Sequence, residues 1–362
     1  MEIESSSRKI AFERNRNERD IAEKKMRCSV VILNWNGADM LRKFLPSVVK
    51  ESEGKDIEIV VADNGSTDDS IAVSGDYPTI RIIQFDKNYG FAEGYNKALE
   101  EVDADYAVLL NSDVEVTTGW LTTLLSYMDA HKDVAACQPK VLSFTEKEQS
   151  GAKKFEHAGA AGGYMDKWGY PYCRGRIRDY VEEDKGQYDN VTDVFWATGA
   201  CLCIRTDVYK ENGGLDGSFF AHMEEIDLCW RLQCRGYRLV CVPESAVYHV
   251  GGGALAYDNP RKTYLNFRNN LLMLYKNLPD NRLHKVLAVR CLLDYVAAMQ
   301  YLIKCEWGNF RAVVKARWDF QHLRKAYKPL REENLQKAIV SYPKTIADRS
   351  IIVDYYLRGK RK

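Results

Sequence analysis

The sequence predicts an α/β fold: a mostly parallel, doubly wound central sheet with helices on both faces, and a helical region at the C-terminal end. Three observations lead to this prediction. Between residues 28 and 144, four apolar, β-branched runs alternate with amphipathic stretches, an order typical of parallel sheets. After residue 259 the apolar residues recur at helical spacing. The 362 residues are 46% hydrophobic, which allows a large core and excludes disorder for most of the chain.

The four apolar runs are each expected to form one strand. They predict strands over residues 29–35, 57–63, 80–86 and 106–116. The stretch after the first run is amphipathic over residues 39–52, and Ser66-Thr67-Asp68 after the second run offers a helix N-cap. The third run leads into the glycine-containing stretch 88–99. We therefore expect helical connections that cover the sheet and return the chain to its starting edge.

Polar residues stand where the predicted strands end: Asn34, Asn36, Asp63, Asn64, Asn88, Asn111 and Asp113. In parallel sheets such residues gather at the edge where ligands bind. The sequence contains neither G-x-G-x-x-G after the first strand nor G-x-x-x-x-G-K-[ST], so it lacks the usual phosphate-binding loops. A diphosphate would then require a divalent cation on a strand-end carboxylate, for which Asp113 is the best candidate. The alternative is that Asp113 only caps the strand.

The charge is divided unevenly along the chain. Residues 261–362 hold 22 Lys and Arg against 8 Asp and Glu, a net charge of +14, and residues 1–260 carry −13. Residues 1–27 form a charged N-terminal arm without the apolar stretch of a secretory signal. The ten cysteines show no C-x-x-C pairing. We therefore expect a cytoplasmic protein with free, buried thiols and a basic end that can meet anions.

Five sequence blocks resemble those of a known family. SVVILNWNG, IVVADNGSTDDS, NYGFAEGYNKAL and LLNSDVEV, in this order, are similar to the nucleotide-sugar half of the family 2 inverting glycosyltransferases, whose GT-A fold is Rossmann-like. TGACLCIRTDVYKENGGLDGSFFAHMEEIDLCWRLQC, followed by VYHVGGG, resembles the acceptor half, especially in the rhamnosyltransferase-like branch. The resemblance covers roughly residues 28–275. It implies a GT-A domain over residues 28–258, with halves at 28–144 and 145–258, before a basic, amphipathic helical region over 259–362.

The resemblance implies donor contacts at the strand ends. Asp63 is expected to hydrogen-bond the uracil or thymine ring of the donor, while Asn34, Trp35 and Asn36 line the base and the ribose. The other implied donor contacts are Asn88, Gly90, Asn96, Asn111 and Ser112. The alternatives are that Asp63 ends its strand through an Asx-turn and that some of the glycines serve packing alone.

A metal site is implied at the fourth strand. The family's motif is often D-x-D, whereas this sequence reads Asn111-Ser112-Asp113. One carboxylate remains, so we expect weak or exchangeable Mg²⁺ or Mn²⁺ at Asp113, completed by the phosphates of the donor. His249 resembles a histidine that some members add as a metal ligand. A histidine before three glycines can equally be a hydrogen-bonding loop residue.

The catalytic base is expected in HMEEIDLCWR, residues 222–231, which matches an acidic motif at a helix start in the family. Inverting transfer needs one carboxylate near the acceptor hydroxyl, opposite the leaving diphosphate. Glu225 is the first candidate and Glu224 its rival, because adjacent helical residues point about 100° apart. Asp227 is the third acidic candidate, expected rather to brace the helix or pair with Arg231. Alternatively, all three form a charge cluster that favours the helix dipole.

The stretch 286–304 predicts a sided helix. It is apolar except for Arg290, Asp294, Gln300 and Lys304, which fall within about one third of the helix circumference. Central charges make it a poor transmembrane span, whereas a broad apolar face beside a basic end suits an interfacial helix on an anionic leaflet. We therefore expect peripheral association with the inner face of the cytoplasmic membrane. The alternative is that the apolar face packs on the catalytic domain or on a second subunit.

Together these features predict an inverting hexosyltransferase of bacterial surface polysaccharide synthesis. The expected donor is a nucleoside-diphosphate sugar, such as dTDP-rhamnose or a UDP-sugar, and the expected acceptor is a glycan or a polyprenyl-diphosphate-linked glycan. The alternatives are a catalytically degenerate GT-A module that only binds nucleotide or glycan, and a nucleotidyltransferase. The acidic residues argue against the first, and the missing glycine-rich basic phosphate loop argues against the second. No nucleic-acid partner is expected.

Overall fold

The computed structural model describes residues 25–156, 159–251 and 259–359. Residues 1–24 of the predicted N-terminal arm lie outside this part of the chain. The last two residues of that arm already belong to the first strand, β1 (Met26–Asn34). The domain boundary predicted at residue 258 also lies outside the described residues and stays a prediction.

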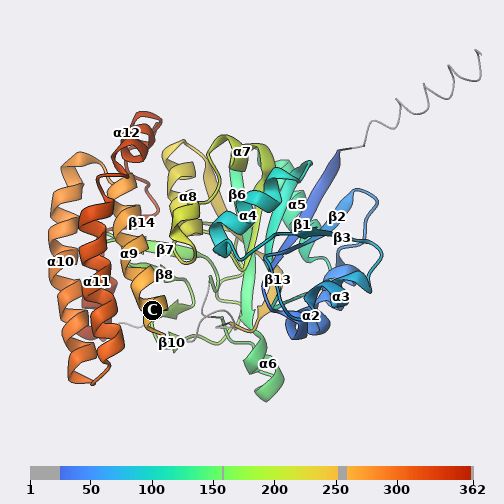
Figure 1. The fold of residues 1–362 in the computed structure, drawn as a ribbon, viewed down its shortest axis with the longest axis horizontal. Coiled ribbons are helices and arrows are strands. Elements are labelled where there is room, and N and C mark those ends of the chain that lie inside the picture. The colour runs from blue at the N-terminus through green and yellow to red at the C-terminus, as the bar shows by residue number, and fades with distance from the viewer. Residues whose placement is uncertain (1–24, 157–158, 252–258, 360–362) are drawn as a thin grey trace, which may run out of the picture.

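The four predicted strand positions form a parallel sheet in the order β3-β2-β1-β4 (Figure 1). β2, β3 and β4 cover Ile57–Asp63, Ile80–Gln84 and Ala104–Asn111. The register pairs Asn34 with Asp63 and Leu33 with Asn111, so the three strands end at one edge. The strand order reverses between β1 and β4, and open α/β sheets bind ligands at such a point. The predicted parallel sheet is confirmed.

The second half of the chain extends this sheet beyond β4. The order continues β4-β12-β6-β13-β11, and β5 pairs with β13. The bounds are Val114–Val116 for β5, Val134–Ser143 for β6, Thr192–Asp193 for β11, Cys201–Arg205 for β12 and Arg238–His249 for β13. β12 is antiparallel to both of its neighbours, whereas β6 and β13 run parallel to each other. The result is the mixed sheet of nine strands that both halves share.

The fourth predicted run, residues 106–116, forms two strands instead of one, and the strand end predicted at Asn111 and Asp113 is confirmed. β4 ends at Asn111, the chain turns at Ser112 and Asp113, and β5 then pairs antiparallel with β13. This pairing places Val114 opposite His249, and Val250 N donates a hydrogen bond to Asp113 O (3.1 Å). The apolar pattern continues through the turn because β5 is buried as well, so periodicity alone did not mark the break.

Helices cover both faces of the central sheet, as the sequence predicts. Alternate residues of β1 enter different core clusters, Val30 and Ile32 on one face and Val31 on the other. The first face packs against α2 (Ala38–Glu51), α3 (Ser70–Gly75) and α5 (Trp120–Ala130), and the second against α4 (Gly90–Glu100), α7 (Thr206–Glu211) and α8 (Glu224–Cys234). All ten cysteines are free, and eight of them are buried, as expected.

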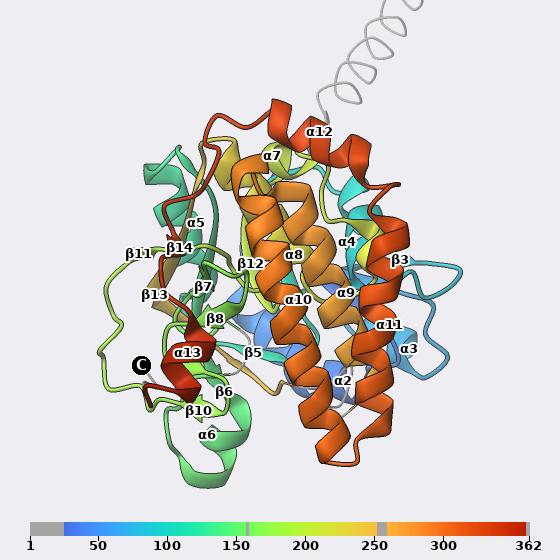
Figure 2. The same cartoon turned by 90° about the vertical axis from the view of Figure 1, so that its left-hand side faces the viewer.

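The C-terminal region is helical and closely attached to the sheet domain (Figures 1 and 2). Its helices are α9 (Pro260–Asn277), α10 (Asp280–Ile303), α11 (Trp307–Leu323), α12 (Lys328–Gln336) and α13 (Ile351–Tyr356). α9 packs against α8, and α10 and α11 form the outer layer. Between α12 and α13, β14 (Ile346–Ala347) pairs with β7 (Gly163–Asp166) of a small second sheet, which also holds β8 (Pro171–Cys173), β9 (Arg176–Ile177) and β10 (Tyr180–Val181).

Helix α10 turns its charged side inward and much of its apolar side outward. Arg290 and Asp294 are buried, and Asp294 also pairs with Arg317 of α11 (2.6 Å). The large hydrophobic residues of this helix that stay exposed are Leu292, Tyr295, Val296, Met299 and Ile303. The prediction of a sided helix is therefore confirmed, but the alternative in which this face packs on the catalytic domain is contradicted. α10 is also the one helix of the described residues with the length and composition to cross a membrane.

Candidate active site

The edge where β1, β2 and β4 end holds a corner of polar side chains. Asp63 is buried at the end of β2, where its Oδ1 accepts from Asn34 Nδ2 (3.2 Å) and its Oδ2 from Ser66 N (2.9 Å). The hydrogen bond from Ser66 N to Asp63 Oδ2 is that of an Asx-turn, which is the alternative role given above for Asp63. Each carboxylate oxygen can still accept a second hydrogen bond. Asp63 therefore ends its strand and keeps acceptor capacity for a ligand.

The loop after β1 completes this corner. Asn36 adopts a left-handed conformation (φ 49°), and its Oδ1 accepts from Thr67 N (2.7 Å). Trp35 beside it is 53% exposed. A Cβ on Gly37 would lie 2.3 Å from Asn34 Oδ1 and 3.5 Å from Ser112 Oγ. The structure thus brings together the residues predicted for the base and ribose, with an aromatic ring open to contact.

The start of α4 is fixed by Asn64, a residue to which the sequence assigned no individual role. Its Oδ1 accepts from Tyr89 N (3.0 Å), and its Nδ2 donates to Asn88 Oδ1 (3.2 Å) and Gly90 O (3.0 Å). Gly90 has a φ of +82°, and a Cβ there would lie 2.7 Å from Phe220 O. The close approach predicted at Gly90 is therefore to the chain's own segment before α8.

Asn96 is set apart from the other predicted donor residues. Its Nδ2 donates to Leu215 O (2.8 Å), while its Oδ1 accepts from the Tyr209 hydroxyl (2.6 Å) and Leu215 N (2.9 Å). These bonds join the middle of α4 to α7 and to the chain after it. Because its amide group is occupied within the fold, we correct its assignment from a donor contact to a structural residue.

Asp113 and His249 face each other where β5 pairs with β13. Asp113 Oδ1 lies 3.1 Å from His249 Nε2, Asn111 Nδ2 lies 3.4 Å from the same nitrogen, and Glu156 Oε2 lies 3.1 Å from His249 Nδ1. All but Asn111 are buried. Burial lowers the pKa of His249, but Asp113 and Glu156 outweigh it and raise the pKa to about 10.

This arrangement fits a divalent cation. A carboxylate and an imidazole nitrogen point to one place, and a second carboxylate behind the imidazole orients its ring, as in many metal sites. A cation there would replace the proton on His249. Within the residues that the structure describes, no three His, Cys, Asp or Glu side chains form a metal-binding group. Phosphate oxygens of a bound donor and water molecules are the usual further ligands of such an ion. Glu156 was not found from the sequence, because a single acidic residue in a glycine-rich stretch gives no pattern.

The first turn of α8 holds the candidate bases. Glu224 is buried and Glu225 is half-buried, and neither Glu224 Oε2 nor Glu225 Oε2 has a hydrogen-bond partner among the described residues. Burial raises the pKa of Glu225 to about 7, and burial together with Glu225 raises that of Glu224 well above its ordinary value. Free carboxylate oxygens with raised pKa values are typical of catalytic groups.

Glu225 lies near the end of β4. A Cβ on Gly199 would be 3.9 Å from Glu225 Cβ, and the next residue, Ala200, accepts a hydrogen bond from Asn111 N (3.0 Å). Gly199 and Ala200 thus connect the start of α8 to the strand end that precedes Asp113. Glu225 as a residue is only half-buried, although its Oε2 is buried, whereas Glu224 is buried as a whole.

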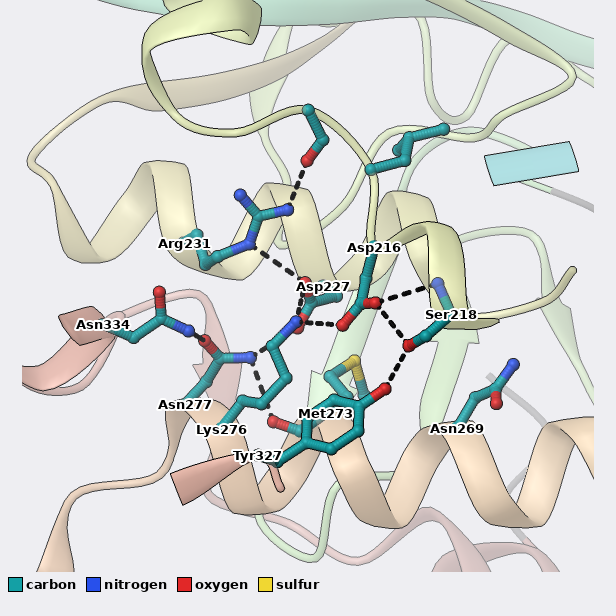
Figure 3. A network of polar contacts seen from close by, with 12 residues as sticks. Asp216, Ser218, Asp227, Arg231, Asn269, Met273, Lys276, Asn277, Tyr327 and Asn334 are labelled. Carbon is teal, nitrogen blue, oxygen red and sulfur yellow. Dashed lines mark hydrogen bonds and ion pairs between the residues drawn. The ribbon is translucent and has the colours of Figure 1, made fainter. Parts of the chain in front are cut away.

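Asp227 is not available to a substrate, which corrects its place among the catalytic candidates. It is fully buried and accepts from Arg231 Nε (3.0 Å), Lys276 Nζ (2.9 Å) and Asn277 Nδ2 (2.8 Å) (Figure 3). Burial raises its pKa, but Lys276 and Arg231 outweigh this and hold the pKa below its ordinary value. The expectation that Asp227 braces α8 and pairs with Arg231 is confirmed.

Comparison with known sequences agrees with this geometry. The family described as "Glycosyl transferase family 2" matches residues 29–194. The N-acetylglucosaminyl-diphospho-decaprenol L-rhamnosyltransferase of Mycobacterium tuberculosis is 25% identical over 232 residues, which cover 61% of this chain and 75% of the relative. The strand ends described above and Glu156 lie within the family match, and α8 follows it.

Comparison with solved structures supports the fold. TarS 1–349 of S. aureus in complex with UDP-GlcNAc superposes with a TM-score of 0.55 at 16% identity, covering 92% of this chain and 93% of that one. GalNAc-T7 with UDP, GalNAc and Mn²⁺ superposes with a TM-score of 0.56 at 16% identity, covering 72% and 49%. These are GT-A glycosyltransferases. Residues 29–194 therefore form a glycosyl transferase family 2 domain, in a chain with a GT-A fold and a C-terminal helical region, and these findings support a glycosyltransferase.

Proposed function

We propose that this glycosyltransferase inverts the configuration of the sugar that it transfers from a pyrimidine nucleoside-diphosphate sugar, such as dTDP-rhamnose or a UDP-sugar, to a polyprenyl-diphosphate-linked glycan or another glycan. The observation that carries the proposal is the half-buried Glu225, with its unpaired Oε2, next to the strand end that bears Asp113 and His249. The mycobacterial relative's name includes a polyprenyl-diphosphate-linked sugar, and TarS was crystallised with a UDP-sugar.

In this reaction the acceptor hydroxyl oxygen forms a bond to the anomeric carbon as the bond from that carbon to the diphosphate oxygen breaks. Glu225 takes the hydroxyl proton during bond formation. Asp63, Asn34 and Asn36 hold the base and ribose, and Trp35 covers them. Asp113 and His249 would hold a Mg²⁺ or Mn²⁺ ion, which supplies charge stabilisation for the leaving diphosphate. Glu156 orients the His249 imidazole.

A transfer assay tests the proposal. Purified protein is incubated with Mn²⁺, a polyprenyl-diphosphate-linked N-acetylglucosamine, and dTDP-rhamnose, UDP-GlcNAc or GDP-mannose in turn. We expect a disaccharide product with one of the two pyrimidine donors, and NMR should show the anomeric configuration opposite to that of the donor. Retention of configuration would refute the single-displacement reaction, and transfer from GDP-mannose alone would refute the pyrimidine assignment.

The rate of transfer should depend on the ionisation of Glu225. Because its pKa is raised to about 7, the carboxylate that accepts the proton is lost as the pH falls below this value. We expect kcat to rise with pH up to about 7 and to level off above it. The measurement is kcat at saturating donor across this range, with Tm followed in the same buffers. A kcat that stays constant through the acid range while the protein remains folded would contradict the role of Glu225.

We further propose that the exposed side of α10 and α11 binds the anionic inner leaflet of the cytoplasmic membrane. Its apolar members are Leu292, Tyr295, Val296, Met299 and Ile303 of α10, and Trp307 and Trp318 of α11; we call this set the α10–α11 face. Exposed basic residues on and next to these helices are Arg282, Lys285, Lys304, Arg311, Lys315, Arg324 and Lys325. Apolar and aromatic residues accompanied by basic ones fit an anionic bilayer surface better than water.

Liposome sedimentation tests the α10–α11 face. Wild-type protein should sediment with vesicles of phosphatidylglycerol and phosphatidylethanolamine. The double variant Leu292→Glu/Ile303→Glu should lose at least about tenfold in partitioning, because it removes two aliphatic side chains that would enter the bilayer and adds charge. Ile339→Glu is the matched control: Ile339 is 80% exposed and Ile303 is 78% exposed, but Ile339 lies after α12. If the wild type fails to bind vesicles and forms dimers that the double variant disrupts, the α10–α11 face joins two copies of the chain instead.

A further inference from the structure

The segment Phe219–Met223, which leads into α8, has an unusual backbone. Phe220, His222 and Met223 have φ values of 65°, 71° and 76°, a region that residues other than glycine rarely adopt. Met223 is the residue directly before α8, so Glu224 and Glu225 begin the helix immediately afterwards. The direction in which Glu225 leaves the backbone therefore depends on how this segment is held. Strained backbone of this kind persists only where surrounding groups fix it.

Asn269 of α9 fixes this segment. Its side chain is fully buried, and its Nδ2 lies within hydrogen-bonding distance of three carbonyl oxygens, those of Phe219 (3.0 Å), Ala221 (2.9 Å) and His222 (2.8 Å). Its Oδ1 accepts from Arg268 Nε (2.8 Å). One primary amide with two N–H donors thus contacts three carbonyl oxygens of this segment, and among uncharged side chains only Asn and Gln carry two such donors.

The same segment also touches the donor side of the site. Phe220 O accepts from Phe91 N (2.6 Å) at the start of α4, where Gly90 allows the approach. On the other side of Glu225, Asp227 is bound to Lys276 and Asn277 of α9 (Figure 3). α9 therefore holds the first turn of α8 from both sides, and Asn269 holds the side that precedes the glutamates.

We propose that Asn269 is a positioning residue for transfer: its amide holds the segment Phe219–Met223, in which three residues are left-handed, and thereby aims Glu225 at the acceptor hydroxyl. The proposal rests on the proposed function, in which Glu225 accepts the proton. It extends the site to the C-terminal helical region, which lies beyond the residues that match the family.

The experiment compares Asn269→Ala with Asn270→Ala. Asn270 is equally buried on the same helix, but its Nδ2 donates to Gly169 O (2.9 Å), its Oδ1 accepts from Arg290, and it meets the segment only through Met223 Sδ at 3.8 Å. For Asn269→Ala we expect kcat with dTDP-rhamnose, Mn²⁺ and the polyprenyl-linked acceptor to fall by about 100-fold, with the donor KM within about threefold, because misplacing a catalytic group by an ångström has an effect of this size. For Asn270→Ala we expect kcat to stay within about threefold of the wild-type value, whereas Tm should fall by about as much as it does in Asn269→Ala.

A readout independent of transfer accompanies the kinetics. Hydrogen exchange of the 219–225 amides should become faster in Asn269→Ala and remain as in the wild type in Asn270→Ala. Asn269→Ser keeps one hydrogen-bond donor. It should fold even if Asn269→Ala does not, and its kcat should lie between that of the wild type and that of Asn269→Ala. Equal kcat losses in the Asn269 and Asn270 variants, unchanged kcat in Asn269→Ala, or failure of both Asn269 variants to fold would overturn the proposal, because each would leave a role in stability alone. An inactive wild type would instead refute the proposed function.

Discussion

Replacing Glu225 with Gln is expected to lower kcat for glycosyl transfer by about 10³-fold, or roughly 4 kcal/mol of activation free energy. The amide keeps the size of the side chain but cannot accept the hydroxyl proton. Because Glu225 is predicted to act on the acceptor, the donor affinity should stay within about threefold of the wild-type value. The measurements are kcat with saturating donor and acceptor, and donor affinity by calorimetry in the presence of Mn²⁺.

Glu224→Gln is the control for this prediction. Glu224 is the adjacent acidic residue, it is buried, and its Oε2 also has no hydrogen-bond partner among the described residues. Burial and the neighbouring Glu225 raise its pKa well above the ordinary value and so favour the protonated form. An amide is then a closer substitute, and kcat should fall by less than about tenfold. If Glu224→Gln causes the larger loss and Glu225→Gln the smaller one, the base is Glu224.

Replacing Asp113 with Ala is expected to weaken Mn²⁺ binding by at least about 100-fold and to reduce transfer in proportion when the metal is limiting. Asp113 is the carboxylate that lies against His249 Nε2 at 3.1 Å. Its removal leaves the imidazole and the phosphate oxygens of the donor as ligands. Manganese affinity can be measured by electron paramagnetic resonance with the donor's nucleoside diphosphate present, and Tm shows whether the fold survives.

Two further variants separate the metal site from general effects of charge. Glu156→Gln removes the charge behind His249 Nδ1 and should weaken Mn²⁺ binding by about 10-fold to 100-fold. Asp133→Ala removes an exposed carboxylate that pairs with Arg238 at the start of β13, at the opposite edge of the sheet, and should leave Mn²⁺ binding unchanged. Manganese affinity that is the same in Asp113→Ala and in the wild type would refute the metal assignment.

The sequence predicted most of the nucleotide-binding half. The β-branched runs before Asn34, Asp63 and Asn111 are long and apolar enough to be buried on both faces of a parallel sheet, and the register confirms that these residues end at one edge. The same argument located Asp113 at this edge, although the separate strand β5 after it was not predicted. Local pattern was sufficient here because each strand is a contiguous run whose end is marked by polar residues.

Residues that act across long distances in the chain could not be predicted. Glu156 lies next to His249 because its N–H donates a hydrogen bond to Val141 O of β6, which pairs in parallel with β13. Asn269 meets Phe219–His222 because α9 packs on α8. Neither residue belongs to a periodic pattern. Asn96 shows the opposite error: its position in a family-like block suggested a donor contact, but Tyr209 and Leu215, more than 100 residues away, occupy its amide.

By itself, the sequence determined the parallel α/β core, the edge at which its ligands gather, the acidic start of α8 and the sided character of α10, because hydrophobic spacing and strand-end polarity are local properties. Only the tertiary structure decided which carboxylate is buried, paired or open. It ties Asp227 to Lys276 and leaves Glu225 Oε2 unpaired, and it turns the charged side of α10 inward. The reason is physical: burial and ion pairing depend on partners that distant segments bring to the site, and no local pattern encodes their distances.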